Sequence, residues 1–229
     1  MRTITIGLLI SLLLAGASVA TAQQQTMRAT SSGMIFATVP PKIDPGARYL
    51  FYLSGYIVEA GNRRPTSPKF GVYEYDEILK AFAREGFVVI SEARIKNPEI
   101  EPYALNVTKQ ITQLLKAGVP ASHITVVGAS QGSWIEMLVS TYLRNRNVRF
   151  VLIAACSANK EFLNRVDLHG AVLSVFEKSD LAQSCEQFRT DATGISEWGE
   201  VALKTGLKHG FIYRPMTEWM APTIAWARR

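Results

Sequence analysis

Short runs of apolar residues alternate with amphipathic stretches from about residue 34 to residue 227. The apolar runs predict strands at 34–39, 49–53, 87–90, 124–127, 149–155, 171–176 and 198–203. The stretches between and after them predict helices at 73–84, 103–117, 131–144, 160–166 and 218–227. This alternation favours an α/β fold, with a mostly parallel central sheet flanked by helices on both faces. In such sheets the ligand site lies beyond the carboxyl ends of the strands.

One strand-to-helix turn carries a candidate nucleophile: residues 128–132 read Gly-Ala-Ser-Gln-Gly. A G-x-S-x-G turn between a strand and a helix is a nucleophile elbow, which exposes the serine hydroxyl at the end of the strand. Glycine is needed at both ends of the turn, because a Cβ there would collide with the neighbouring strand or helix. We predict Ser130 as the nucleophile and the Gln131 N–H, at the helix N-terminus, as an oxyanion donor. The alternative is a glycine-serine turn without chemistry.

The chain has only three histidines that could act as the base for Ser130. His123 and His169 directly precede predicted strands, so both lie at the amino edge of the sheet, away from Ser130. His209 lies in the loop 205–211 after the last predicted strand, at the carboxyl edge. We therefore predict that His209 takes the Ser130 proton, the alternative being a buried structural histidine.

The acidic partner of the histidine is expected between the serine and the histidine along the chain. Asp180 shortly follows the predicted strand 171–176 and so reaches the carboxyl edge. It would accept a hydrogen bond from the imidazole, fix its tautomer and stabilise the imidazolium. Glu177 is a rival for this role, and Asp180 could instead be a helix N-cap.

The elbow turn, Asp180 and His209, in this order on alternating strands and helices, resemble the α/β-hydrolase superfamily over about residues 36–226. The resemblance implies an α/β-hydrolase fold and a serine hydrolase that cleaves a carboxylic ester through an acyl-enzyme. Such hydrolases often carry a lid before the strand that bears the acid. Here that interval, 157–170, is long enough for one short helix and no cap domain. We therefore expect an open pocket that accepts small or accessible esters.

The resemblance also implies a second oxyanion donor from the loop after an early strand. The corresponding residues here are Leu53, Ser54, Gly55 and Tyr56, with Ser54 in place of the usual histidine. The Tyr56 N–H is expected to pair with the Gln131 N–H, unless this loop is only a tight turn. Ser54 and Gly55 are then expected beside the substrate.

Three further side chains are candidates for the substrate pocket. Trp134 lies in the first turn of the elbow helix, although it could be a core residue. Glu92 and Arg94 follow the strand 87–90, and alternate residues of an extended segment share a side. Arg94 would either bind a substrate carboxylate or form a structural ion pair that braces the serine or histidine loop, and we prefer the second interpretation.

The N-terminus has the pattern of a signal peptide. Arg2 is followed by the apolar run 4–14 and by an A-x-A site that ends at Ala22. The run is too short for a comfortable membrane span, and residue 17 is alanine where a lipobox needs cysteine. We expect export to the periplasm or beyond, cleavage after Ala22 and no stable membrane anchor; a retained anchor is the alternative. Residues 23–32 are expected to be a flexible lead to a single domain, 33–229.

Two cysteines, Cys156 and Cys185, follow strands at the carboxyl edge. In an exported chain such a pair favours a disulfide, with two free thiols as the alternative. In the chain-entropy model the bond would stabilise the fold by about 3–4 kcal/mol, and it would tether the Asp180 loop.

The charge distribution and the absence of binding motifs in the sequence argue against several classes of ligand. Without Arg2, 24 basic and 19 acidic side chains remain, and the basic ones are scattered, so nucleic-acid binding has little support. The histidines and cysteines lack metal-ligand spacing, and neither a P-loop nor G-x-G-x-x-G occurs, so we expect no metal and no cofactor. The expected partner is a small-molecule ester or other acyl substrate. The sequence gives no indication of the oligomeric state.

Two functions from different classes remain open. The first is the exported serine esterase, with a thioesterase, amidase or peptidase as variants, because the three residues do not choose the leaving group. The second is a catalytically inactive member of the same fold that serves as a binding or envelope protein. A separation of Asp180 and His209 beyond hydrogen-bond reach would favour the second.

Overall fold

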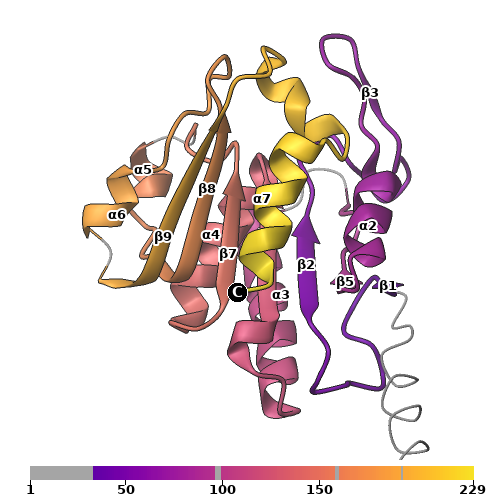
Figure 1. Ribbon diagram of the computed structural model, residues 1–229, viewed down its shortest axis with the longest axis vertical. Coiled ribbons are helices and arrows are strands. Elements are labelled where there is room, and N and C mark those ends of the chain that lie inside the picture. The colour runs from indigo at the N-terminus through magenta and orange to yellow at the C-terminus, as the bar shows by residue number, and fades with distance from the viewer. Residues whose placement is uncertain (1–32, 96–98, 158–159, 192) are drawn as a thin grey trace, which may run out of the picture. The chain divides into compact units, whose positions relative to one another are not determined.

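The computed structural model describes residues 33–95, 99–157, 160–191 and 193–229 (Figure 1). The predicted signal peptide and the predicted lead, residues 1–32, lie outside the described residues. In the described part, no helix combines the length and the apolar character needed to cross a bilayer.

The central sheet has seven strands in the order β1-β5-β2-β6-β7-β8-β9, and every neighbouring pair is parallel. The strands are β1 (Ile35–Phe36), β2 (Tyr49–Leu53), β5 (Val88–Ile90), β6 (Ile124–Ala129), β7 (Arg149–Ile153), β8 (His169–Glu177) and β9 (Gly194–Leu203). The predicted α/β class with a parallel sheet is confirmed. Because all the strands run the same way, their carboxyl ends meet at one edge of the sheet.

Helices cover both faces of this sheet (Figure 1). One face packs against α2 (Tyr75–Arg84) and α7 (Thr217–Ala227), and the other against α3 (Ile100–Lys116) and α4 (Gln131–Leu143). Alternate residues of β2 serve the two faces: Tyr52 joins the first core and Phe51 the second. A strand buried on both faces needs apolar residues throughout, which is why these strands appear in the sequence as continuous apolar runs.

Some elements differ from the prediction. β9 begins at Gly194 instead of residue 198, because it is an edge strand whose half-exposed, polar first half has no apolar run. A small hairpin, β3 (Thr66–Ser67) and β4 (Gly71–Val72), and the short helix α6 (Gln187–Asp191) were not predicted. His209 lies in a 3-10 helix, η3 (Lys208–Tyr213), and not in an irregular loop. The other short helices are η2 (Ala121–His123) and α5 (Lys160–Leu163).

Two buried side chains of α4 hold β6 to β7 directly beneath the elbow. The Ser133 hydroxyl lies 2.6 Å from the Gly128 carbonyl oxygen and 2.9 Å from that of Ile153. The Glu136 carboxyl accepts the N–H groups of Gly128 and Val151, at 2.7 and 2.6 Å. Burial raises the pKa of Glu136 well above its usual value, in opposition to these two hydrogen bonds. These contacts fix the helix that follows Ser130 against the strand that precedes it.

Candidate active site

The parallel sheet brings the loops of six strands to its carboxyl edge. The chemistry-bearing residues of these loops lie in the spatial order of the strands: Arg94 after β5, Tyr56 after β2, Ser130 after β6, Cys156 after β7, Asp180 after β8 and His209 after β9. His123 precedes β6 and His169 begins β8, so both lie at the amino edge. The sheet thus separates His209 from the other two histidines.

Ser130, His209 and Asp180 form a continuous chain of hydrogen bonds. His209 Nε2 lies 2.9 Å from the Ser130 Oγ, and His209 Nδ1 lies 2.7 Å from the Asp180 Oδ2. The Asp180 side chain is only 6% exposed, and its Oδ1 accepts the Leu181 N–H at 2.7 Å. With Nδ1 protonated, the carboxylate accepts from it, and Nε2 is the acceptor for the Ser130 hydroxyl. The structure therefore brings the three predicted side chains together; their catalytic role stays a prediction.

The backbone at Ser130 has the strain expected of an elbow. Its φ is +54°, a value that few residues other than glycine adopt. A Cβ on Gly132 would lie 1.9 Å from the Leu53 carbonyl oxygen, and one on Gly128 would lie 2.5 Å from the Glu136 carboxyl. The predicted need for glycine at both ends of the turn is thus confirmed.

Gly132→Ala is expected to lower the free energy of unfolding by about 3 kcal/mol or more, since the new methyl group meets rigid backbone of β2. The matched control is Gly61→Ala, because a Cβ at Gly61 meets nothing within 4 Å and its φ needs no glycine. Urea unfolding of the two variants measures the difference. Equal stability of both variants would contradict this packing.

Glu177, the rival acid, has a different role from Asp180. Its carboxylate accepts from the N–H and hydroxyl of Thr205, at 2.7 and 2.6 Å, and from those of Ser179, at 3.2 and 3.1 Å. It thereby ties the loop that carries Asp180 to the loop that leads to His209. Burial opposes its ionised form, but these hydrogen bonds outweigh burial and hold the pKa of Glu177 below its usual value.

The lowered pKa of Glu177 predicts a pH-dependent contribution to stability. A carboxyl whose pKa is lower in the folded chain stabilises the fold fully above its unfolded pKa, about 4.3, and the contribution disappears as pH falls through the folded value. The Tm difference between the wild type and Glu177→Gln should therefore be largest near pH 7 and shrink below pH 4.3. Thermal unfolding over this range measures it, and a difference independent of pH would contradict the assignment.

His209 is held by elements that the sequence did not reveal. The ring of Phe70, from the β3–β4 hairpin, lies 6.1 Å from the imidazole, centroid to centroid. Lys208 has a φ of +52°, and its N–H donates to the Ser179 hydroxyl at 3.1 Å. The turn signal of Pro68 and Gly71 could have indicated the hairpin, but no sequence pattern pointed to its contact with His209.

The predicted oxyanion loop lies beside Ser130. A Cβ on Gly55 would be 3.8 Å from the Ser130 Cβ, and the Gly55 N–H points to the Tyr73 hydroxyl at 3.5 Å. Tyr56 is half-exposed and lies with Gly55 along the wall of a cavity at Ser130. Ser54 is fully buried and does not line that cavity, contrary to the prediction.

The contacts of Arg94 also differ from both interpretations of the sequence. Its guanidinium is buried and its Nη2 donates to the carbonyl oxygens of Ser54 and Gly55, at 2.7 and 3.3 Å. Glu92 is exposed and accepts the Tyr103 hydroxyl at 2.8 Å, and the Arg94 guanidinium lies over the ring of the same tyrosine, so the two residues share a neighbour without pairing. Arg94 does brace the loop 54–56, but through backbone carbonyls; within the described residues it has no ion pair with a carboxylate.

Two cavities meet at Ser130 and His209. One, of about 320 Å³, is lined by Gly55, Tyr56, Ile57, Tyr73, Ile212 and Tyr213. The other, of about 490 Å³, extends past Lys69, Phe70, Trp134, Ser157, the Asp180 loop and Lys208. Trp134 therefore borders the site, and its Nε1 donates to the Ala155 carbonyl at 2.9 Å. The site has room on both sides of the Ser130 hydroxyl.

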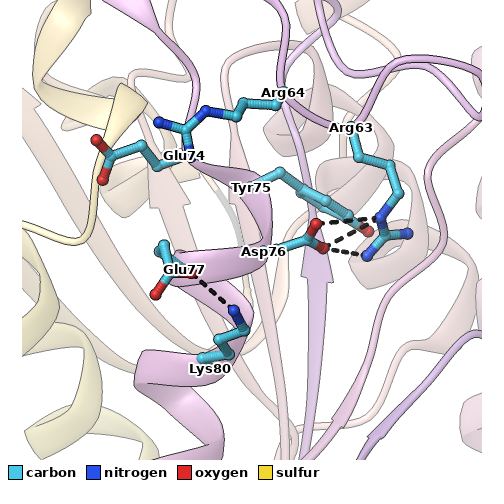
Figure 2. A pocket seen from close by; sticks show the side chains of 7 residues that line it. All are labelled: Arg63, Arg64, Glu74, Tyr75, Asp76, Glu77 and Lys80. Carbon is cyan, nitrogen blue, oxygen red and sulfur yellow. Dashed lines mark hydrogen bonds and ion pairs between the residues drawn. The ribbon is translucent and has the colours of Figure 1, made fainter.

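A third cavity, of about 230 Å³, lies over the start of α2 and holds none of the predicted site residues (Figure 2). Its charged side chains largely neutralise one another: Arg63 pairs with Asp76, and Glu77 pairs with Lys80 at 2.7 Å. Across the described residues, no cluster of three His, Cys, Asp or Glu side chains could hold a metal ion.

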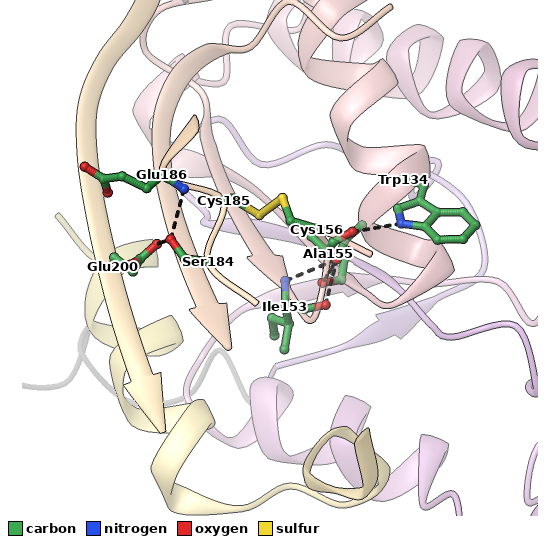
Figure 3. The surroundings of a disulfide bond; sticks show 10 residues. Trp134, Ile153, Ala155, Cys156, Ser184, Cys185, Glu186 and Glu200 are labelled. Carbon is green, nitrogen blue, oxygen red and sulfur yellow. Dashed lines mark hydrogen bonds between the residues drawn. A yellow bond between two sulfur atoms is a disulfide. The ribbon is translucent and has the colours of Figure 1, made fainter. Parts of the chain in front are cut away.

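The predicted disulfide is present between Cys156 and Cys185 (Figure 3). It joins the loop after β7 to the segment that follows Asp180, and the Cys156–Gln183 bridge pairs the same two segments. The bond thus restrains the far end of the Asp180 loop.

Comparison with known proteins identifies the fold of the chain. No family model matches the chain, and no curated protein does either. An esterase from the archaeon Pyrobaculum calidifontis is similar in structure, at 17% identity and a TM-score of 0.58, over 82% of this chain and 77% of that one. An esterase/lipase from an uncultured bacterium matches at 11% identity and 0.57, with the same coverage. The chain has the α/β-hydrolase fold.

Within the described residues between β7 and β8, the fold carries no cap domain. Between β7 and β8 the structure shows α5 (Lys160–Leu163) as the only helix in the described residues. An α/β serine hydrolase from Xanthomonas campestris that is described as lacking a lid is similar at 12% identity and a TM-score of 0.50, over 83% of this chain and 85% of that one. At such identities the likeness is one of fold alone.

Proposed function

We propose that the protein is a serine hydrolase that cleaves a carboxylic ester through an acyl-enzyme, with Ser130, His209 and Asp180 as its catalytic residues. The observation that carries the proposal is the hydrogen-bond chain from the Ser130 hydroxyl through His209 to the buried Asp180 carboxylate. An inactive binding protein would have no need of this chain, nor of the strained backbone that holds Ser130 at its end.

In the proposed reaction the Ser130 Oγ attacks the ester carbonyl carbon while His209 Nε2 takes its proton. The tetrahedral intermediate collapses, the C–O bond to the alcohol breaks, and His209 protonates the leaving oxygen. Water then attacks the acyl-enzyme and passes a proton to His209. That proton returns to Ser130 as the acid leaves. Asp180 stays ionised throughout and stabilises the imidazolium.

The negative oxygen of each tetrahedral intermediate would be bound by two backbone donors, the N–H groups of Gln131 and Tyr56. Gln131 begins α4, so its N–H has no acceptor within the helix and carries the positive end of the helix dipole. Gly55, next to Tyr56, lies against Ser130. The two cavities at Ser130 would then hold the acyl and alcohol parts, and their size and openness suit small or accessible esters.

We also propose that the protein acts outside the cytoplasm, in the periplasm or beyond. The disulfide supports this location, since such bonds persist in oxidising compartments.

The test of the proposed function is hydrolysis of p-nitrophenyl esters of increasing acyl length by the purified protein. We expect turnover of the acetate and butyrate, an initial burst of nitrophenol equal to the enzyme concentration, and a decline with longer chains. A folded protein that hydrolyses none of these esters, nor the matching thioesters and amides, would favour the inactive binding protein.

A further inference from the structure

Arg94 is a buried cation directly behind the predicted oxyanion loop. The residue is 1% exposed. Its Nη2 is shared by three acceptors: the carbonyl oxygens of Ser54 and Gly55, and the side-chain Oε1 of Gln131 at 3.4 Å. Its backbone is also tied to the loop, since its carbonyl accepts the Ala60 N–H at 2.7 Å. Arg94 therefore contacts both predicted sources of an oxyanion donor: the Gly55–Tyr56 peptide and Gln131.

The charge of this guanidinium is not neutralised by the described residues around it. Its Nε and Nη1 have no hydrogen-bond partner there, and no carboxylate pairs with it. The electrostatic neighbours of Arg94 are the hydroxyls of Tyr52, Tyr73, Tyr75 and Tyr103. Burial raises the pKa of all four, that of Tyr73 to about 12, so at neutral pH none supplies a negative charge. A buried charge without a counter-charge is costly, which suggests that it serves the site.

The hydrogen bonds to the Gly55 carbonyl, one of them from Arg94, fix the direction of the Tyr56 N–H. The peptide between Gly55 and Tyr56 is trans, so its C=O and its N–H point to opposite sides. The C=O accepts from the Arg94 Nη2 and from the Val58 N–H, each at 3.3 Å, so the N–H is directed away from Arg94. A cation beside the carbonyl oxygen also polarises the peptide, which makes its N–H a stronger hydrogen-bond donor.

We propose that Arg94 is a positioning residue that fixes the Gly55–Tyr56 peptide for oxyanion binding and that supplies the positive charge balancing the oxyanion. This proposal rests on the proposed function and identifies a residue that stabilises the transition state of that reaction. In the free enzyme the cation has hydrogen-bond acceptors but, among the described residues, no counter-charge. In each tetrahedral intermediate the negative oxygen, on the far side of one peptide, becomes its counter-charge. The interaction thus exists mainly in the transition state, so it should act on kcat and not on KM.

The test compares Arg94→Met and Arg94→Lys with the wild type, using p-nitrophenyl acetate and phenylboronic acid. A serine-bound boronate is tetrahedral and negatively charged, so it reports the oxyanion site without turnover. Arg94→Met is expected to lower kcat by about 10- to 100-fold, with KM within about threefold, and to weaken boronate inhibition by a similar factor. Arg94→Lys keeps a charge but offers fewer contacts, and should recover part of both losses.

Tyr103→Phe is the matched control. It keeps the ring that lies 5.7 Å from the guanidinium and removes only the hydroxyl that donates to Glu92. Its kcat and boronate affinity should stay within about twofold of the wild type.

Three results would overturn the proposal: an unchanged kcat in Arg94→Met, a loss confined to KM, or equal losses in Arg94→Met and Arg94→Lys. If Arg94→Met does not fold, Arg94→Lys decides, because unchanged kcat and boronate affinity in that variant would show that the fork of hydrogen bonds to the loop is not needed and would overturn the positioning role. A wild type that neither turns over esters nor binds the boronate would instead refute the proposed function. An active wild type with an equally active Arg94→Met refutes only the role of Arg94.

Discussion

Ser130→Ala is expected to lower kcat/KM for p-nitrophenyl acetate by about 10⁴-fold or more, because it removes the atom that forms the acyl-enzyme. The helix α4 and the Asp180–His209 hydrogen bond do not depend on the hydroxyl, so the variant should fold. Binding of the ester should change little, since the loop 54–56 and both cavities remain. The loss should therefore appear in kcat, and the nitrophenol burst should vanish.

The matched control for Ser130→Ala is Ser196→Ala, which removes a hydroxyl near the amino end of β9, at the opposite edge of the sheet. This variant should retain wild-type kcat. Activity of Ser130→Ala within tenfold of the wild type would mean that another group is the nucleophile.

Asp180→Asn is expected to lower kcat by about 10³- to 10⁴-fold while leaving the fold intact. The asparagine amide can donate a hydrogen bond to His209 Nδ1, which favours the tautomer with a proton on Nε2. That tautomer cannot accept the Ser130 proton, and the neutral amide cannot stabilise the imidazolium. Steady-state kinetics at neutral pH measure the loss, and thermal unfolding shows whether the fold is retained.

The chain offers a control for Asp180→Asn in a second aspartate beside a histidine. Asp167 Oδ1 lies 3.9 Å from His169 Nδ1 at the amino edge of the sheet, away from Ser130. Asp167→Asn should retain kcat. If both variants lost activity equally, a general loss of carboxylate charge, and not the contact with His209, would be the cause.

The elements that could be predicted from the sequence are those that are buried in the hydrophobic core. β2 was predicted at 49–53 and lies at those residues, because a strand buried on both faces needs apolar residues throughout. The positions of Ser130 and His209 followed from the same regularity, since parallel strands place all of their carboxyl ends at one edge. Asp180 and Glu177 could not be separated by this rule, because both follow or end the same strand. Their side-chain directions decide between them, and these depend on Thr205 and Ser179.

The role of Arg94 could not be predicted because it depends on the path of the chain after β5. The two-residue periodicity of an extended segment placed Glu92 and Arg94 on one side. In the structure both contact Tyr103, but Glu92 is exposed and Arg94 is buried, a difference that the periodicity does not predict. The acceptors of Arg94 are backbone carbonyls, which leave no trace in the amino-acid sequence.

The most direct test of the central claim is to identify the residue that a fluorophosphonate modifies. We expect one adduct per chain, located by peptide mass spectrometry on Ser130. The adduct should be absent from Ser130→Ala and should form far more slowly in His209→Ala, which lacks the base. No adduct on the folded wild type, or an adduct on any other residue that persists in Ser130→Ala, would contradict the assignment of Ser130 as the nucleophile.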